Sequence, residues 1–291
     1  MRLVAYSVDN QHKLGICGSD PEKIVDIQTI GLHADDMLDL IKTLSAADSG
    51  EICRKVDAAE GIPVSQCTIL SPIKHPAQDV ICLGVNFYEH RNETEASDIT
   101  FDAQLNKTVY FSKRAHETVD PGDYIDGHWD LIHGLDYEVE LAVILGKDAY
   151  QVPLDQAEEY VCGYTILNDV SARDLQAAHQ QWYFGKSLDR FTPLGPWIVT
   201  RDEFAWPPVA DLRCYVNGEL RQSNNTKNMI TGIAQAIHQL SQGMTLKAGT
   251  IIAMGTPSGV GMAFDPPKYL KAGDVVRCEI QGIGYLENVV R

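Results

Sequence analysis

Long apolar runs, paired cysteines and phosphate-binding glycine loops are all missing from this sequence of 291 residues. No uncharged apolar stretch approaches the ~20 residues of a membrane-spanning helix, and the N-terminal stretch has no apolar core of signal-peptide length. The seven cysteines include no CxxC pair and several lie in apolar segments, so we expect buried free thiols rather than disulfides or a zinc site. These absences predict a cytoplasmic protein that does not contact membranes.

Positive charge is also scarce. The chain has 24 Lys and Arg against 40 Asp and Glu, which gives a formal net charge of −16. Such a balance disfavours binding to nucleic acid or to an anionic membrane surface. It also repels anionic small molecules, so a site for one would need local positive charge from a metal ion or from lysine and arginine.

The pattern of apolar residues predicts a mainly β fold with some α-helix, in the α+β class. Neither a βαβ alternation nor a GxGxxG loop is present, and β-like runs outnumber helical ones beyond residue 75. Proline-containing turns near that residue predict a small N-terminal α/β domain over 1–75 and a catalytic domain over 76–291. Asn217-Gly218 predicts a two-residue hairpin turn. Helical spacing is clearest in three segments: 35–48, 172–181 and 229–242.

A run of alternating residues from Asp136 to Gly146 places two carboxylates on one side of a predicted strand. Because side chains alternate across a strand, Glu138 and Glu140 point the same way. Like charges this close repel each other unless a cation lies between them, and Mg²⁺, Mn²⁺ and Ca²⁺ all prefer oxygen ligands. The pair therefore indicates a metal site or, from the spacing alone, two solvent-facing side chains on an edge strand.

A third acidic position follows the apolar segment that begins at Tyr164. Asp169 comes at the end of this predicted strand, where its carboxylate could supply another metal ligand. The alternative is a turn or capping role, which is common for an aspartate just before a helix. Arg173 and Asp174, at the start of that helix, could form a simple surface pair.

Further positions could take part in catalysis or substrate binding. His90 and Glu93 share a face if their segment is helical, so the carboxylate could orient the imidazole as a general base; a surface histidine is the alternative. Lys186 lies in an aromatic loop and is a candidate partner for an anion or enolate. Thr256 belongs to the glycine-rich stretch 255–261, which suits carboxylate binding but is also common in hairpins without a function.

Five motifs in this order resemble the fumarylacetoacetate hydrolase family, from about Gln78 to the C-terminus. They are LGVNF (83–87) with His90-x-x-Glu93, DYEVELAVILGK (136–147), NDVSARD (168–174), GKSLDR (185–190) and GTPSGVG (255–261). The resemblance implies a β-rich fold rolled around a metal cavity, usually in a homodimer. It also implies a role for each candidate residue: Glu138, Glu140 and Asp169 as ligands of Mg²⁺ (or Mn²⁺ or Ca²⁺), His90 and Glu93 as a water-activating lid pair, Lys186 as the catalytic-loop lysine, and Thr256 as a substrate contact.

The implied reaction is hydrolysis of a C–C bond in a small 2-oxo or β-diketo acid of the acylpyruvate or fumarylpyruvate type, as in aromatic degradation. In it the metal and Lys186 would stabilise an enolate, while His90, oriented by Glu93, activates water. Decarboxylation of oxaloacetate and isomerisation of a 2-hydroxy-diene-dioate remain open on the same site. A non-enzymatic, metal-stabilised binding protein is a more distant alternative, because it would need neither a base nor a lysine.

One segment departs from the family pattern. Arg114 stands where members often have proline, in a stretch that commonly approaches the cavity and that holds three potentially cationic residues within 113–116. A planar guanidinium can pair with a carboxylate through two hydrogen bonds. We therefore expect Arg114 to bind a second carboxylate of the substrate; the alternative is a solvated turn.

Overall fold

The computed structural model describes residues 1–45, 48–95, 107–179 and 181–291, and the side chains of 92–95 lie outside this description. Its strands are β1 (Arg2–Val8), β2 (Gln11–Cys17), β3 (Lys23–Asp26), β4 (Ile62–Pro63), β5 (Thr68–Leu70), β6 (Val80–Gly84), β7 (Val109–Lys113), β8 (Tyr124–Ile125), β9 (Leu135–Asp136), β10 (Val139–Leu145), β11 (Val161–Asn168), β12 (Ser171–Ala172), β13 (Leu194–Thr200), β14 (Asp211–Val216), β15 (Glu219–Asn225), β16 (Ile251–Ala253), β17 (Val275–Ile280) and β18 (Gly284–Val290). Its α-helices are α1 (Met37–Ser45), α2 (Ser49–Ala58), α3 (Tyr88–Glu95), α4 (Arg173–His179), α5 (Tyr183–Lys186) and α6 (Ile233–Ser241). Short 3-10 helices are η1 (Ile27–Ile30), η2 (Val64–Gln66), η4 (Leu154–Tyr160), η5 (Arg201–Glu203), η6 (Thr226–Asn228) and η7 (Gly261–Ala263).

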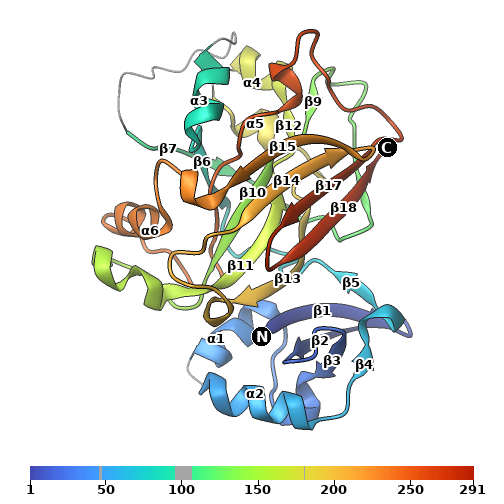
Figure 1. The fold of residues 1–291 in the computed structure, drawn as a ribbon, viewed down its shortest axis with the longest axis vertical. Helices are drawn as coiled ribbons and strands as arrows, with labels where there is room; N and C mark the ends of the chain where they lie inside the picture. The colour runs from blue at the N-terminus through green and yellow to red at the C-terminus, as the bar shows by residue number, and fades with distance from the viewer. Residues whose placement is uncertain (46–47, 96–106, 180) are drawn as a thin grey trace.

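Two sheets form the body of the molecule. The larger has the strand order β4-β3-β2-β1-β13-β11-β10-β16-β6-β7, with β5 paired to β1, and the smaller has the order β15-β14-β17-β18-β8. Apolar side chains of β10 and β14 meet in one buried cluster between the two sheets. Figure 1 shows one sheet in front of the other. Strands therefore outweigh helices, and the predicted mainly β fold with α is confirmed.

The N-terminal strands join the same large sheet as the rest of the chain. Arg2 and Leu3 of β1 pair with Val199 and Ile198 of β13. In Figure 1 the elements β1 to β3, α1 and α2 lie together at the lower end of the molecule. The division into domains 1–75 and 76–291 stays a prediction, and the pairing of β1 with β13 shows what links the two parts.

Strand β10 is buried along its whole length, between β11 and β16. Its alternation follows the prediction: Val139, Leu141, Val143 and Leu145 face the cluster between the sheets, while Ala142 and Ile144 face a second cluster that includes residues of α1 and α2. Glu138 and Glu140 continue this second face toward the start of the strand. Glu140 thus lies on an inner strand and Glu138 directly precedes that strand, both buried, so the edge-strand alternative is wrong.

Local predictions agree well with the described elements. The predicted segments 35–48, 172–181 and 229–242 contain α1, α4 and α6, each shorter than the pattern suggested. The predicted hairpin joins β14 to β15, and both turn residues have positive φ, 52° for Asn217 and 80° for Gly218. Asparagine and glycine tolerate this conformation at little cost, which explains their place in the turn.

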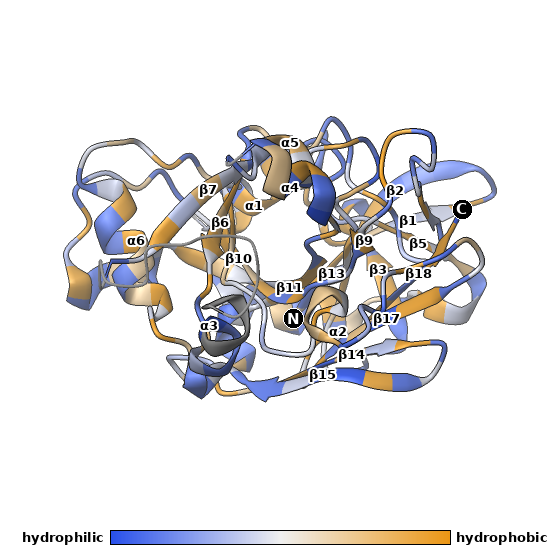
Figure 2. Ribbon diagram, turned by 90° about the horizontal axis from the view of Figure 1, so that it is seen from above, coloured by the Kyte–Doolittle hydropathy of each residue, from blue (hydrophilic) through white to orange (hydrophobic). Residues whose placement is uncertain are grey.

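Three helices gather at the end of the molecule opposite the N-terminal strands. Figure 1 shows α3, α4 and α5 at its upper end, and the view from above in Figure 2 has α3 on one side of β10 and α4 with α5 on the other. These helices bring the segments with His90, Arg173 and Lys186 to the end of β10 where Glu138 and Glu140 lie. In the part of the chain that the structure describes, no helix is both long and apolar enough to cross a membrane.

Candidate metal centre

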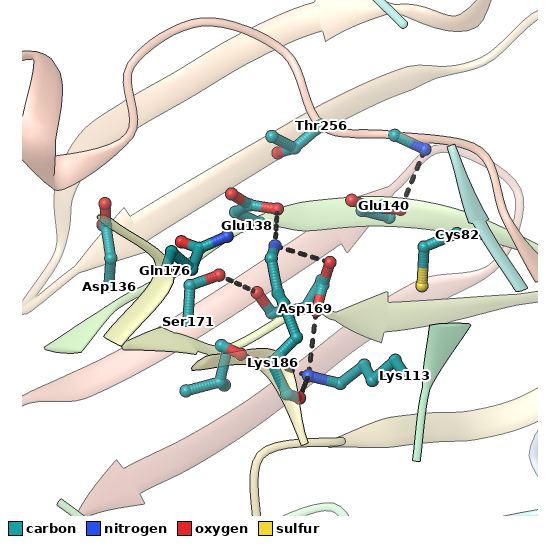
Figure 3. Close-up of polar contacts among 12 residues, drawn as sticks. Cys82, Lys113, Asp136, Glu138, Glu140, Asp169, Ser171, Gln176, Lys186 and Thr256 are labelled. Carbon is teal, nitrogen blue, oxygen red and sulfur yellow. Dashed lines mark hydrogen bonds and ion pairs between the residues drawn. The ribbon is translucent and has the colours of Figure 1, made fainter. Parts of the chain in front are cut away.

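Strand register brings three carboxylates together. Val139 of β10 lies opposite Asn168 of β11, so Asp169, the next residue, comes beside Glu138, and the Asp169 N–H donates to the Glu138 carbonyl at 2.8 Å. Glu138, Glu140 and Asp169 each offer an oxygen within 4.8 Å of the others, and their exposed fractions are only 5%, 1% and 0%. The three predicted ligands therefore form one buried cluster (Figure 3).

Lys186 lies against this cluster. Its Nζ is 2.6 Å from Glu138 Oε2 and 2.7 Å from Asp169 Oδ2, and Figure 3 shows the ammonium between the two carboxylates. Burial raises the pKa of Glu138, but Lys186 and then Arg173 outweigh it and lower that pKa to about 2. Burial lowers the pKa of Lys186, but Asp169 and Glu138 outweigh it and leave that pKa raised. Both groups are therefore charged at neutral pH.

Glu140 is compensated less well, because the charge of Lys186 only partly offsets burial and the neighbouring carboxylates. One of its oxygens accepts a hydrogen bond from the Gly255 N–H at 2.8 Å, and among the described residues no ion pair is found for it. Burial, Asp169 and Glu138 raise the pKa of Glu140 well above its usual value. Ionised Glu140 therefore needs a nearby cation, and the all-oxygen donor set suits a hard divalent ion such as Mg²⁺ or Mn²⁺. The residues present fit a metal ion.

Lys113 is a second buried cation beneath the cluster. Its Nζ is 2.8 Å from Asp169 Oδ1 and donates to the backbone carbonyls of Val170 and Lys186. The ammonium thus has two hydrogen-bonded carbonyls and one paired carboxylate around it, and the side chain is fully buried. Lys113 thus holds Asp169 and the backbone of Lys186 in place without lining the cavity.

Arg173 joins the cluster to the glycine-rich loop. Its Nε is 2.8 Å from Asp136 Oδ2 and its Nη2 is 2.6 Å from Glu138 Oε1, so it is a buried ion-paired residue, and the surface pair with Asp174 is wrong. Asp136 also accepts hydrogen bonds from the N–H groups of Gly261, at 2.7 Å, and Met262, at 3.1 Å. This network positions the loop that follows β16 against the carboxylates.

Metal binding would make the local charge positive. When Glu140 is ionised to hold a metal, the four carboxylates (Asp136, Glu138, Glu140, Asp169) and the three cationic side chains (Lys113, Arg173, Lys186) sum to one negative charge. A divalent cation would turn this into one positive charge, which would attract an anion even in a chain of net charge −16.

A small cavity opens beside the cluster. Its volume is about 30 Å³, enough for one or two water molecules. Its polar wall includes Glu138, Glu140, Lys186 and Thr256, and its apolar wall includes Phe111 and Trp182. The cavity is therefore lined by both polar and aromatic side chains, and the Lys186 Nζ lies over the Phe111 ring, 5.3 Å from its centroid.

Of the other predicted site residues, His90 and Thr256 line the cavity. His90 of α3 is 5% exposed and lines the cavity, whereas the side chain of Glu93 lies outside the described residues. Thr256 lines it too, but its hydroxyl donates to the Val139 carbonyl at 3.0 Å and accepts from Gln222 at 2.7 Å. Its proton is thus already used within the protein.

Arg114 is not brought to the cavity. Its side chain is exposed and is not among the described residues that line the site, while its backbone N–H donates to the Ser187 hydroxyl at 3.0 Å. Binding of a second carboxylate by Arg114 stays a prediction that this placement does not support.

Sequence reasoning gave no role to Lys113, Asp136, Gln176 or Trp182. Lys113 was visible as a lysine at the end of an aromatic strand, and Asp136 as the first residue of the alternating run. Gln176 lies three residues after Arg173 on α4 and accepts a hydrogen bond from it at 3.0 Å. Helical spacing could have suggested that contact, but nothing in the sequence marked it as part of a cavity.

Comparison with known proteins gives one consistent picture. A family model described as "Fumarylacetoacetate (FAA) hydrolase C-terminal" matches residues 79–291. The chain is 41% identical over 228 residues to "Oxaloacetate tautomerase YisK" of Bacillus subtilis, covering 78% of this chain and 74% of that protein. It is also 41% identical over 231 residues to rat mitochondrial "Oxaloacetate tautomerase Fahd2a", covering 79% and 71%.

Solved structures match the whole chain. A fumarylacetoacetate hydrolase from Exiguobacterium antarcticum superposes with a TM-score of 0.84 at 37% identity, covering 100% of this chain and 99% of that one. A maleylpyruvate hydrolase from Sphingobium sp. SYK-6, in complex with manganese(II) and pyruvate, has a TM-score of 0.78 at 28% identity, covering 100% and 98%.

Proposed function

The chain belongs to the fumarylacetoacetate hydrolase family, and on that premise we propose that it interconverts the keto and enol forms of a small 2-oxo acid, with a divalent metal as cofactor. The observation that carries the proposal is the buried Glu138, Glu140 and Asp169 cluster with Lys186 beside it. Oxaloacetate is the first substrate to test, because relatives at 41% identity are named oxaloacetate tautomerases.

Glu138, Glu140 and Asp169 would hold the metal. A bound divalent ion supplies Lewis acidity that stabilises negative charge developing on a 2-oxo oxygen. The backbone hydrogen bond between Asp169 and Glu138 fixes the main chain at two of the three ligand positions. Such preorganisation is a large part of how sites stabilise developing charge.

Lys186 would supply the second positive charge. Its ammonium is already directed at the carboxylate cluster, at 2.6 Å from Glu138 and 2.7 Å from Asp169. An enolate oxygen next to the same carboxylates would lie within reach of this donor, and a charge-assisted hydrogen bond to an oxyanion is stronger than a neutral one. Lys186 would therefore stabilise the enolate and donate a proton to its oxygen, which gives the enol, and in the reverse direction it would take that proton back.

His90 would move the proton at carbon 3 of the acid. It is buried, it lines the cavity, and an imidazole can both accept and return a proton near neutral pH. Glu93 follows on the same helix, α3, and is the predicted partner that orients the ring. Removal of the proton from carbon 3 gives the enolate, and its return gives the keto acid.

Hydrolysis of a C–C bond is the second candidate. The structural similarity to a maleylpyruvate hydrolase that binds manganese and pyruvate favours it, and the same His90 could activate water instead of a carbon-bound proton. Decarboxylation and diene-dioate isomerisation would use the same enolate. A purely structural metal site is less well supported, because Lys186 and His90 both line the cavity.

One experiment separates these activities. Purified protein loaded with Mg²⁺ or Mn²⁺ would be mixed with oxaloacetate while the enol absorbance is followed, and with acetylpyruvate and fumarylpyruvate while released pyruvate is measured. We expect faster keto–enol conversion of oxaloacetate that chelator abolishes. Pyruvate release from an acylpyruvate without enol conversion would replace the first candidate with hydrolysis, and neither activity would overturn both.

A further inference from the structure

Trp182 closes the apolar side of the cavity. It directly precedes α5, and its carbonyl accepts a hydrogen bond from the Lys186 N–H at 3.1 Å. Residues four apart on a helical turn share a face, and both Trp182 and Lys186 line the cavity. The indole also meets Phe111 edge to face, with ring centroids 5.2 Å apart and an interplanar angle of 75°. One turn thus carries the cation and the aromatic wall of the same site.

The indole ring lies directly on Gly84, the last residue of β6. A Cβ added at Gly84 would be 2.4 Å from Cζ3 of Trp182 and 2.9 Å from its Cη2, closer than real side chains approach. Glycine at this position therefore lets the ring lie flat against the strand end. Leu83 and Val85 on either side, together with Met262, extend the apolar wall.

This wall faces the part of a substrate that the carboxylates cannot hold. A 2-oxo acid that presents its carboxylate and 2-oxo oxygens to the metal residues must direct carbon 3 and its tail elsewhere. Arg173 and Gln176 on the polar side already bond to each other at 3.0 Å, whereas a hydrocarbon tail gains from apolar contact. An apolar tail would gain most from contact with Trp182 and Phe111, and the whole cavity is small, with a volume of about 30 Å³.

We propose that Trp182, held on Gly84 and Phe111, is the specificity residue that disfavours long apolar tails on the 2-oxo acid. This inference rests on the proposed function, since it assumes that the cavity binds a 2-oxo acid. Each methylene that a pocket rejects is worth about 10- to 200-fold in discrimination, so a large ring at the tail position has a measurable effect.

The neighbouring residue provides a matched control. Tyr183 follows Trp182 on the same short helix, but its side chain is 44% exposed and is not among the described lining residues. Substitution of Tyr183 tests any general disturbance of α5, including displacement of Lys186, without changing the cavity wall.

Binding of unreactive acids tests the inference independently of the reaction. Titration calorimetry on the Mn²⁺-loaded protein would measure Kd for pyruvate, 2-oxobutanoate and 2-oxohexanoate. We expect the wild type to bind pyruvate and 2-oxobutanoate at least about tenfold more tightly than 2-oxohexanoate. Trp182→Ala should bind 2-oxohexanoate at least about tenfold more tightly than the wild type does, Trp182→Phe should lie between the two, and Tyr183→Ala should keep the wild-type order.

The outcomes separate two kinds of failure. If none of the acids binds to the metal-loaded wild type, the proposed function is wrong. If pyruvate binds but tail length has no effect in the wild type, or if Trp182→Ala and Trp182→Phe both keep the wild-type preference, the role of Trp182 is overturned while the 2-oxo acid site stands.

Discussion

The backbone N–H of Asp169 donates to the backbone carbonyl of Glu138 at 2.8 Å, so two of the three candidate metal ligands are joined through the main chain. The Glu138 N–H in turn donates to the side chain of Asn168 at 3.0 Å. Because these bonds belong to the junction of β10 and β11, the spacing of the two carboxylates depends on strand pairing rather than on a loop. The main chain at these two ligand positions is therefore fixed before a metal binds.

Loss of any one ligand should remove metal binding. We expect Asp169→Asn and Glu140→Gln to weaken Mn²⁺ binding by at least about tenfold, because even changes next to metal ligands have effects of 10- to 100-fold. Titration calorimetry measures the affinity, and circular dichroism checks the fold. Asp148→Asn is the control, since its carboxylate is exposed and pairs with Lys247 at 2.7 Å, away from the cluster. Undiminished affinity in both ligand variants would place the metal elsewhere.

Glu140 should make the metal-free protein less stable as the pH rises. Its raised pKa means that the folded state holds this proton more tightly than the unfolded chain, whose glutamate titrates near 4.3. The resulting stability is fully present below about pH 4.3 and is lost as the pH rises toward the folded pKa.

Glu140→Gln removes this titration and should therefore be stabilising in chelator. We expect its Tm at pH 8 to exceed that of the wild type by at least about 2 °C, and the difference to be smaller at pH 5. A shift of about 2 °C corresponds to about 1 kcal/mol of stability in a large domain. Scanning calorimetry at both pH values measures the difference. An equal difference at the two pH values would contradict the assigned cause.

Substitution of Lys113 should lower folding stability, whereas substitution of Lys186 should remove activity. Lys113→Met leaves the buried Asp169 without one counter-charge, and breaking a buried ion pair costs about 3–5 kcal/mol, so we expect a corresponding loss in the free energy of unfolding. Lys147→Met is the control, because that lysine is 44% exposed and its pair with Glu159 has a longer distance of 3.4 Å. Urea denaturation measures both.

Lys186→Met should instead keep or improve metal affinity. The ammonium of Lys186 contacts one carboxylate oxygen of Glu138 and one of Asp169, so its removal leaves two more oxygens of the candidate ligands free for a metal. We expect Mn²⁺ to bind at least as tightly as in the wild type while keto–enol conversion is lost. Activity that survives this change would show that Lys186 only balances charge.

The sequence and the structure lead to different expectations for substitution of Arg114. The sequence predicted a contact with a second carboxylate, whereas the structure exposes this side chain outside the described cavity wall. From the structure we expect Arg114→Ala to change kcat/KM for oxaloacetate by less than about twofold. A loss of roughly tenfold or more, the scale of one charge-assisted hydrogen bond, would restore the sequence prediction.

The three candidate metal ligands could be predicted from the sequence, but most of the residues around them could not. Alternation along 136–146 was enough to place Glu138 and Glu140 on one face, and an aspartate at a strand end was enough to suggest Asp169. Lys186 was also named, as a partner for an anion or enolate. The places of Lys113 and Arg173 in the cluster could not be found in this way, because they come from β7 and α4 and meet the carboxylates only through tertiary packing. The position of Trp182 on Gly84 likewise depends on a contact across about 100 residues.

Assembly is a separate matter. The homodimer implied by the family resemblance stays a prediction, and light scattering coupled to size exclusion would test it. A monomer at working concentration would contradict that expectation without affecting the metal site.

The most direct test of the central claim is hydrogen exchange at carbon 3 of an acid that is not cleaved. Proton NMR in D₂O would follow 2-oxobutanoate with the Mg²⁺-loaded protein, with the same protein in chelator, with Asp169→Asn, and with Mg²⁺ alone. Stabilisation of an enolate by the metal centre predicts rapid exchange with the loaded wild type only. Exchange no faster than with Mg²⁺ alone, or equally fast in Asp169→Asn, would contradict it.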